Sequence, residues 1–241
     1  MEMNCREILR EGASELGFAL GEEQIQKLLT YKELLLEWNE KVNLTSITDE
    51  KEIMIKHFLD SLTCVIKPYI KNRDKVIDVG TGAGFPGIPI HIYYPEIQLT
   101  LLDSLQKRIA FLEEVYKNIG IKNIIFQHGR AEDFGANPKF REKYDIALAR
   151  AVAQLSVLCE YCLPFVKKGG YFLCQKGPNV DEELINAKNA IELLGGQFIE
   201  KIDIKLPFGD IKHNIIVIKK IKQTPTKYPR KAGTPTKSPI F

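Results

Sequence analysis

The sequence predicts an α/β fold in which a mostly parallel, seven-stranded sheet ends in an antiparallel hairpin and is preceded by a cap of helices. Three observations lead to this prediction. Residues 1–70 show helical periodicity and no β-rich run. Short β-branched and apolar runs then alternate with helical patterns, which is typical of a parallel sheet covered on both faces. Finally, the last two strand-like runs are joined by a link too short for a crossover helix.

Residues 1–70 are predicted to form the helical cap. Segment 22–44 places its apolar residues at spacings of three, four and seven, which gives a helix one apolar face: Ile25, Leu28, Leu29, Tyr31, Leu35 and Trp38. A second helix is expected over 48–62, with Thr48 or Asp49 as its N-cap.

The sheet domain is predicted to span residues 71–221. Its five parallel strands are expected at the apolar runs 75–80, 99–103, 123–129, 144–150 and 170–176. A helical pattern over 104–120 connects the second run to the third. Runs 197–207 and 213–221 are separated only by "FGDIK", so they are expected to pair as an antiparallel hairpin.

Residues 222–241 are predicted to form a basic, proline-rich tail. The segment 219–241 contains seven Lys or Arg, four Pro and no acidic residue, which leaves the preceding part mildly acidic although the whole chain carries +3. Such a tail suits a polyanion as partner. The alternative is a solvated, disordered end, which is common at termini.

The composition, with 44% hydrophobic and 27% charged residues, is that of a globular protein. No window of about 18 residues is free of charges and turn signals, so no membrane span is expected, and the charged N-terminal segment does not resemble a signal peptide. Five scattered cysteines suggest a reducing, cytoplasmic compartment. Cys159 and Cys162 form a C-x-x-C inside an expected buried helix, and no metal site is predicted.

The segment "VIDVGTGAGFPGIP" contains two overlapping glycine patterns. Gly82, Gly84 and Gly87 match the G-x-G-x-x-G of dinucleotide-binding loops. Asp78 with Gly80, Gly82 and Gly84 matches D-x-G-x-G-x-G, the pattern of S-adenosylmethionine-binding loops. The dinucleotide pattern requires an apolar residue where Gly80 stands, and five parallel strands followed by a hairpin are typical of methyltransferases. The sequence therefore favours S-adenosylmethionine, with NAD binding and a purely structural turn as alternatives.

Further candidates lie at the carboxyl ends of the expected strands, where ligands bind in doubly wound sheets. Asp78 ends the first strand, where a carboxylate can help to hold an ammonium group. Asp103 ends the second and is expected to accept bonds from ribose hydroxyls. The backbone of Ala131 and Glu132, after the third strand, is expected at the adenine edge. Arg150 ends the fourth and is expected to face cofactor and substrate, with an ion pair to a nearby acid as the alternative.

Motifs constrain the methyl acceptor only in part. The N/D-P-P-Y/F turn used to methylate exocyclic amines is absent. His57, Asp60 and Ser61 lie at helical spacings, but no glycine elbow presents the serine, so they are expected to support the pocket and not to form a hydrolase triad. Guanine N7 already has a free lone pair, so its methylation needs mainly positioning and exclusion of water.

Eight sequence blocks, from about residue 15 to the tail, closely resemble the bacterial glucose-inhibited division protein B family. The blocks are "WNEKVNLTSIT", "HFLDS", "DVGTGAGFPGIP", "LLDSLQKRIAFL", "GRAEDF", "ARAVAQL", "QKG" and "RKAGTPTKSPI". The resemblance implies S-adenosylmethionine-dependent methylation of guanine N7 in 16S ribosomal RNA, with small-subunit ribosomal RNA or the 30S particle as partner. One mild departure is Ile240, where the family tail has leucine.

The resemblance also implies a Rossmann-like, class I S-adenosylmethionine-dependent methyltransferase fold and a set of site residues. Together with the glycine pattern, it gives these cofactor contacts: Asp78, Gly80, Gly82, Phe85, Asp103, Ser104, Leu105, Ala131, Glu132 and Arg150. It places the N-terminal helices and the tail at the border of the RNA site. The candidate RNA contacts are Lys176, which ends the fifth strand, and the tail cations Lys227, Arg230, Lys231 and Lys237.

The expected reaction is direct in-line methyl transfer without a general base, with Arg150 as a positioning residue. Three other functions stay open. A small-molecule methyltransferase is disfavoured by the basic tail. An RNA-binding assembly factor that uses the cofactor only structurally is compatible with the lack of an obligate catalytic residue. An NAD oxidoreductase would be recognised by nicotinamide binding.

Overall fold

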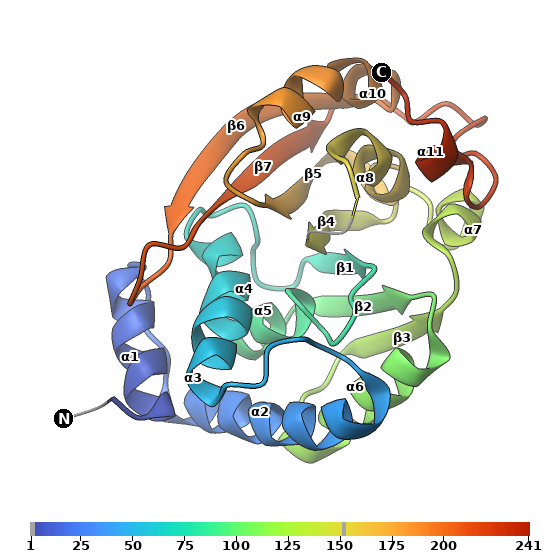
Figure 1. Cartoon of the computed structure of the whole chain (residues 1–241). Coiled ribbons are helices and arrows are strands. Elements are labelled where there is room, and N and C mark those ends of the chain that lie inside the picture. Colours follow the sequence, from blue (N-terminus) through green and yellow to red (C-terminus); the bar gives the residue numbers. More distant parts are fainter. Residues whose placement is uncertain (1–2, 151–152) are drawn as a thin grey trace.

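The structure is a computed structural model that describes residues 3–150 and 153–241. Seven strands form one sheet, with helices on both faces (Figure 1). The strands are β1 (Lys75–Val79), β2 (Gln98–Asp103), β3 (Ile124–His128), β4 (Tyr144–Arg150), β5 (Val166–Lys176), β6 (Gly196–Lys205) and β7 (Lys212–Lys220). Their order in the sheet is β3-β2-β1-β4-β5-β7-β6.

The pairing of the strands confirms the predicted topology. Strands β1 to β5 are parallel to one another, whereas β7 runs antiparallel to both β5 and β6. Strand β5 begins at Val166 and not at residue 170, because Val166 already pairs with Tyr144 before a shift in register. This extension was not predicted from the sequence, because the intervening "KKGG" has no apolar pattern.

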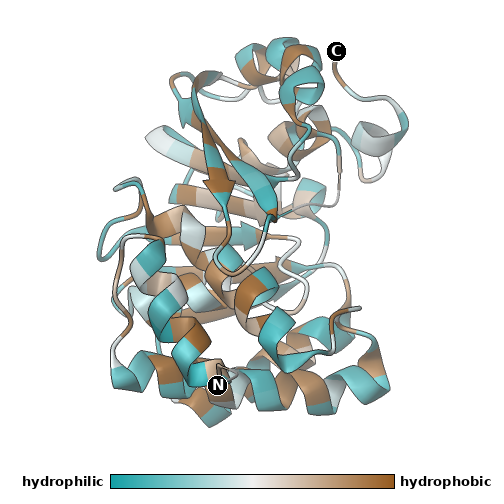
Figure 2. Cartoon of the chain, turned by 60° about the vertical axis from the view of Figure 1, so that its left-hand side comes forward, coloured by the Kyte–Doolittle hydropathy of each residue, from teal (hydrophilic) through white to brown (hydrophobic). Residues whose placement is uncertain are grey.

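The N-terminal helices pack on one face of the sheet. They are α1 (Cys5–Glu15), α2 (Glu22–Val42) and α3 (Glu50–Ile53), which continues through a π-helical turn η1 (Met54–Leu59) into α4 (Asp60–Leu62) and a 3-10 turn η2 (Thr63–Val65). Asp49 caps α3 by accepting a hydrogen bond from Glu52 N at 2.9 Å, as predicted. Figure 2 shows apolar and polar residues interleaved along these helices, as expected for helices with one buried face.

Two apolar clusters fill the two sides of the sheet. Ile146 and Leu148 of β4 point into the cluster that also contains the N-terminal helices, whereas Ala147 and Ala149 point into the other. The first side also carries α5 (Gly87–Tyr93) and α6 (Gln106–Ile119). The second carries α8 (Leu155–Cys162), α9 (Asp181–Asn186) and α10 (Lys188–Leu193). Both cysteines of the C-x-x-C lie fully buried on α8, and burial raises the pKa of each thiol well above its usual value.

The tail packs against the second side, so the alternative of a solvated, disordered end does not hold. Thr224 and Tyr228 are buried, and the tail carries the short helix α11 (Thr234–Lys237) next to α7 (Ala131–Ala136) and α8 (Figure 1). The guanidinium of Arg141 donates to the carbonyls of Thr224 and Tyr228 at 2.6 and 2.8 Å. Within the described residues, no helix combines the length and apolar character that crossing a bilayer requires.

Candidate cofactor and substrate site

A cavity of about 630 Å³ opens at the carboxyl ends of β1, β2 and β3. It lies where the strand order reverses, because the chain passes from β1 outward to β3 and then returns to β4 on the other side of β1. Ligands bind at such switch points in doubly wound sheets. The cavity is lined by six of the residues predicted to bind the cofactor: Gly80, Asp103, Ser104, Leu105, Ala131 and Glu132.

The loop after β1 has a backbone that favours glycine. The φ angle is 72° at Gly80, 61° at Gly82 and 96° at Gly84. These values lie in the left-handed region, where a residue with a side chain is strained. A Cβ atom at Gly80 or Gly82 would meet no atom within 4 Å, whereas one at Gly84 would collide with the Tyr31 hydroxyl and lie 2.9 Å from Leu112. Glycine at 80 and 82 is therefore explained by the backbone conformation alone, whereas Gly84 also lets α2 pack against the loop.

Asp78 lies beneath this loop and not on the cavity surface. Its side chain is fully buried, and Oδ2 accepts hydrogen bonds from Thr81 Oγ1 at 2.7 Å and from Gly87 N at 2.9 Å. Oδ1 has no protein partner. Burial raises the pKa of this carboxyl to about 6, and the two hydrogen bonds act against that rise. The geometry thus supports a role for Asp78 in shaping the loop.

Asp103 joins the loop after β1 to the loop after β2. Its Oδ2 accepts from Gly82 N and its Oδ1 from Leu105 N, both at 2.9 Å. Arg108 adds an ion pair at 3.2 Å from the first turn of α6. A carboxylate has about four acceptor sites, and the two backbone bonds use two of them, while Arg108 Nη1 approaches both oxygens at 3.2 and 3.5 Å. The predicted ribose hydroxyls would therefore replace these longer Arg108 contacts.

The loops after β2 and β3 form the two sides predicted to hold the adenosine. Leu105 is a large apolar side chain that is 42% exposed on the cavity surface, where it offers an apolar contact for a base. Ala131 and Glu132 begin α7 on the other side. The Glu132 side chain is nearly buried, and its Oε1 accepts a hydrogen bond from Gly233 N at 2.8 Å. Its carboxylate therefore binds the tail, which leaves only its backbone for the predicted adenine contact.

Phe85 and Arg150 lie outside the cavity lining, on the side of the N-terminal helices. The Phe85 ring stacks against His57, at a centroid distance of 4.6 Å, and against Tyr31, at 5.4 Å. The Arg150 guanidinium lies 4.9 Å from the centre of the same ring. Arg150 therefore contacts the glycine loop through Phe85.

Arg150 also forms the ion pair that was the alternative to a cofactor contact. Its Nη1 lies 3.0 Å from Asp60 Oδ2, and its Nη2 lies 3.3 Å from His57 Nδ1. His57 Nε2 in turn contacts Thr45 Oγ1 at 2.8 Å. Burial, together with the positive charge of Arg150, lowers the pKa of His57 to about 3, so this ring is neutral. His57 and Asp60 thus hold Arg150 beside Phe85, which is consistent with the supporting role predicted for them.

The five candidate RNA contacts fall into two groups. Lys176 pairs with Glu183 at 2.7 Å, and Arg230 pairs with Glu160 at 2.6 Å. These two cations already pair with partly or fully buried carboxylates, so each has a structural contact within the protein. The other three, Lys227, Lys231 and Lys237, are exposed on the tail.

The cavity-lining residues that were not predicted include Tyr161, Gly233 and Thr236. Tyr161 comes from α8, and the other two come from the tail. Tyr161 and Thr236 join through their hydroxyl oxygens at 2.9 Å. The tail block "RKAGTPTKSPI" contains Gly233 and Thr236, but its pattern does not place them at the cavity, because they approach it only through the packing of the tail against α7 and α8.

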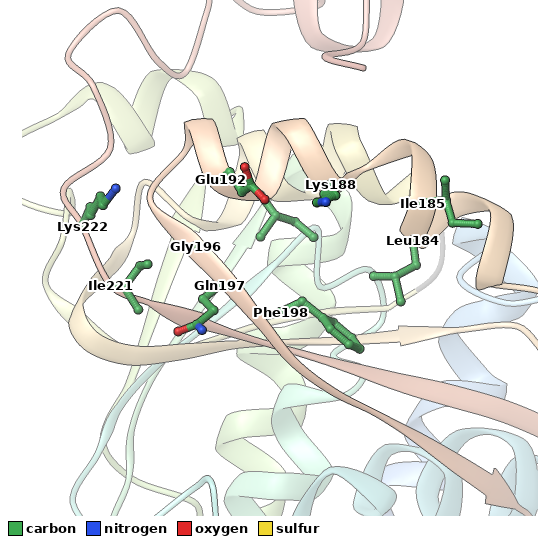
Figure 3. Close-up of a pocket in the computed structure, with 10 residues that line it drawn as sticks. Leu184, Ile185, Lys188, Glu192, Gly196, Gln197, Phe198, Ile221 and Lys222 are labelled. Atoms are coloured by element: carbon green, nitrogen blue, oxygen red, sulfur yellow. The ribbon is translucent and has the colours of Figure 1, made fainter.

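A second cavity, of about 640 Å³, lies between α9, α10 and the edge strand β6 (Figure 3). It is lined by Leu184, Ile185, Phe198 and other side chains around Lys188 and Glu192. It contains no residue of the glycine loop and lies away from the carboxyl ends of the parallel strands. Its volume alone therefore does not make it a candidate cofactor site.

The first cavity fits S-adenosylmethionine in size and chemistry. Its volume is within the usual range of about 300–1,000 Å³ for small-molecule sites. Asp103 offers acceptors for ribose hydroxyls, Leu105 offers an apolar surface for a base, and Gly80 exposes backbone for the amino-acid end. A mostly parallel sheet with a terminal hairpin and this glycine loop define the class I S-adenosylmethionine-dependent methyltransferases.

Comparison with solved structures agrees with this class. TYW2 of M. jannaschii in complex with AdoMet gives a TM-score of 0.51 at 17% identity, over 64% of this chain and 72% of that one. MtNAS in complex with S-adenosylmethionine gives 0.54 at 12% identity, over 89% and 77%. At such low identity these matches show the fold alone.

Comparison of sequences shows the family. The chain belongs to the GidB family, described as rRNA small subunit methyltransferase G, whose model matches residues 24–205. The ribosomal RNA small subunit methyltransferase G of Alkaliphilus metalliredigens is 60% identical, over 99% of this chain and all of the relative. The protein of the same name from Thermoanaerobacter pseudethanolicus is 52% identical over the full length of both chains. The cofactor is therefore S-adenosylmethionine, and NAD is excluded.

Proposed function

We propose that this chain transfers a methyl group from S-adenosylmethionine to N7 of a guanine in small-subunit ribosomal RNA. Family membership supports the RNA substrate, because the family and its relatives are named for the small ribosomal subunit. The proposed partner is that RNA, free or in the 30S particle, in the cytoplasm.

The choice of N7 is carried by one observation: the titratable side chains around Phe85 and beneath the glycine loop, His57, Asp60 and Asp78, are engaged within the protein and not free to act as a general base. His57 is neutral, and both of its ring nitrogens have partners. Asp60 pairs with Arg150, and Asp78 is buried beneath the loop. Such a site suits an acceptor atom that needs no deprotonation, and guanine N7 has a free lone pair.

The bound cofactor supplies an electrophilic methyl group on a sulfonium. The residues of the chain hold and orient the cofactor. Asp103 and Leu105 hold the adenosine, and the loop from Gly80 to Phe85 sets the position of the amino-acid end. Arg150 and His57 keep Phe85, and with it the loop, in place. Orientation and exclusion of water then supply the rate enhancement.

The target guanine is expected to be unpaired. Side chains do not reach N7 in the deep, narrow major groove of an RNA helix. The exposed tail cations Lys227, Lys231 and Lys237 are proposed to bind phosphates near the target, because each is free of an ion pair to a described acidic residue. Their positive charge fixes the strand and carries no base specificity.

The test is methyl transfer from radiolabelled cofactor to 30S particles and to free 16S ribosomal RNA. Treatment of the product with borohydride and aniline should cleave the RNA at the labelled site, because this chemistry cuts at 7-methylguanosine. A matched RNA in which 7-deazaguanine replaces guanine should accept no label. Label that enters either RNA without cleavage would assign the methyl group to another atom. Cofactor binding without any transfer would favour an assembly factor.

A further inference from the structure

The wall of the cofactor cavity is completed by the tail. Gly233 and Thr236 line the cavity opposite the strand ends, although they lie about a hundred residues beyond Glu132 in the sequence. Figure 1 shows α11, which contains Thr236, beside α7 and α8. The tail therefore touches the same space as the loops after β1, β2 and β3.

Two direct hydrogen bonds attach the tail to the cavity wall. Gly233 N donates to Glu132 Oε1 at 2.8 Å, and Thr236 Oγ1 lies 2.9 Å from the hydroxyl of Tyr161. Glu132 belongs to the side of the cavity predicted to hold the adenine. A displacement of the tail would thus open the cavity on its adenosine side.

An ion pair holds this part of the tail in position. The Glu160 side chain is only 1% exposed, and Arg230 binds it with its backbone N at 2.8 Å, Nε at 3.0 Å and Nη2 at 2.6 Å. A buried carboxylate without a partner is strongly unfavourable, so Glu160 fixes Arg230 firmly. Next to it, Pro229 packs against Gly135 of α7.

We propose that Gly233 and Thr236 are cofactor-binding residues, that segment 228–237 is a wall of the cofactor site, and that Arg230 and Glu160 are its positioning pair. The tail would then serve the cofactor as well as RNA. This inference goes beyond the proposed function, because it depends on the cofactor and not on the identity of the methyl acceptor.

The first test measures the affinity for S-adenosylhomocysteine, the demethylated product of the cofactor, by calorimetry on the full chain. Arg230→Gln and Glu160→Gln should each weaken binding about tenfold, the effect of one lost charge-assisted hydrogen bond or more. Lys222→Gln is the matched control, because it removes one exposed positive charge from the same tail outside the cavity. It should bind like the wild type.

A second pair of variants, with smaller changes, tests whether weaker binding could come from a folding defect. Tyr161→Phe and Thr236→Val each remove the hydroxyl contact between α8 and the tail at nearly unchanged side-chain volume, and should weaken binding about threefold to tenfold. Circular dichroism and thermal unfolding without ligand should stay close to the wild type for both.

The second readout is tryptic cleavage of the tail in the wild-type chain. S-adenosylhomocysteine should slow cleavage after Lys231 and Lys237, which flank the cavity residues, because ligand binding suppresses local opening. Unchanged affinity in the tail variants, with unchanged cleavage, would overturn the proposal while leaving the methyltransferase intact. A wild-type chain that does not bind S-adenosylhomocysteine at all would overturn both it and the cofactor assignment.

Discussion

At the scale of single residues, two carboxylates hold the glycine loop from different sides. Asp78 binds it from below through Thr81 and Gly87, and Asp103 binds it from the next strand through Gly82. Both positions were predicted from the sequence as direct cofactor contacts. The structure separates them, because only Asp103 lines the cavity. Asp78 lies beneath the loop, whereas Asp103 lies at the cavity. A sequence pattern gives the spacing of such residues but not their distance from the cavity surface.

Arg150 and Asp60 are expected to act as a unit. Arg150→Ala should lower single-turnover methyl transfer at least tenfold, because Phe85 loses the guanidinium that lies against its ring. Asp60→Asn should have a similar effect, and the double variant should be little worse than either single variant, since the residues share one ion pair. Double-mutant kinetics measures this coupling. Fully additive losses would mean that the two side chains act independently.

The buried, neutral His91 is expected to make the fold sensitive to acid. Burial lowers its pKa from the usual 6.5 to about 4, so below pH 6.5 the unfolded chain binds a proton that the folded chain does not. This histidine therefore contributes stability above pH 6.5 that is lost as the pH falls toward 4, by about 1.4 kcal/mol per pH unit.

The leucine variant isolates this contribution. His91→Leu removes the titrating group from a buried site on α5, so its free energy of unfolding relative to the wild type should rise as the pH falls from 6.5 to 4. Urea unfolding at several pH values provides the measurement. The difference between the two proteins should be constant above pH 7, and a constant difference at every pH would exclude the assignment.

At the scale of elements, α2 is fitted to the glycine loop. The hydroxyl of Tyr31 donates to the Ala83 carbonyl, and its ring packs near Phe58 and Phe85. This contact explains why the loop needs glycine at position 84 even though that residue faces away from the cofactor. The helical cap is thus part of the cofactor site's support.

Gly84→Ala should destabilise the protein by about 1–3 kcal/mol, the usual cost of overpacking, with additional strain from its positive φ. Gly209→Ala is the matched control, because a Cβ atom there meets nothing within 4 Å and its φ is not in the left-handed region. Thermal unfolding compares the two variants. Equal melting temperatures would show that the loop can move away from α2 at little cost.

The elements that the sequence predicted well are those with a local signal. The parallel strands are continuous apolar runs, the hairpin follows from a short link, and Asp49 caps a helix in its own neighbourhood. The tail was not predicted to be packed, because its composition is that of a solvated segment. Its order depends on Glu160, which lies 70 residues before Arg230, and no local pattern carries such a pairing.

At the scale of the whole molecule, the positive charge of the tail divides into two parts. Arg230 is used inside the protein, whereas Lys227, Lys231 and Lys237 face solvent. Replacing these three lysines by glutamine should flatten the dependence of RNA affinity on salt, with a slope smaller by about 2 to 3, since each phosphate contact contributes about 0.7–0.9. Fluorescence anisotropy with a ribosomal RNA fragment at several salt concentrations measures the slope.

A matched triple variant distinguishes local contacts from net charge. Lys168, Lys188 and Lys222 are also exposed and lie outside the cofactor cavity. Replacing them by glutamine changes the net charge by the same amount and should leave most of the salt slope in place. An equal decrease of the salt slope in both triple variants would mean that RNA affinity depends only on the overall charge of the protein.

The position of the tail leads to a further expectation, that cofactor and RNA bind cooperatively. Lys231 and Lys237 flank Gly233 and Thr236, so RNA that immobilises these lysines also orders the wall of the cofactor cavity. RNA should then raise the affinity for S-adenosylhomocysteine about fivefold or more, and the ligand must raise RNA affinity by the same factor. In the variant with glutamine at 227, 231 and 237, the affinity for S-adenosylhomocysteine without RNA should equal that of the wild type. The factor by which RNA raises this affinity should fall toward one. Titrations in both orders measure it, and a factor of one in the wild type would show that the tail serves its two ligands independently.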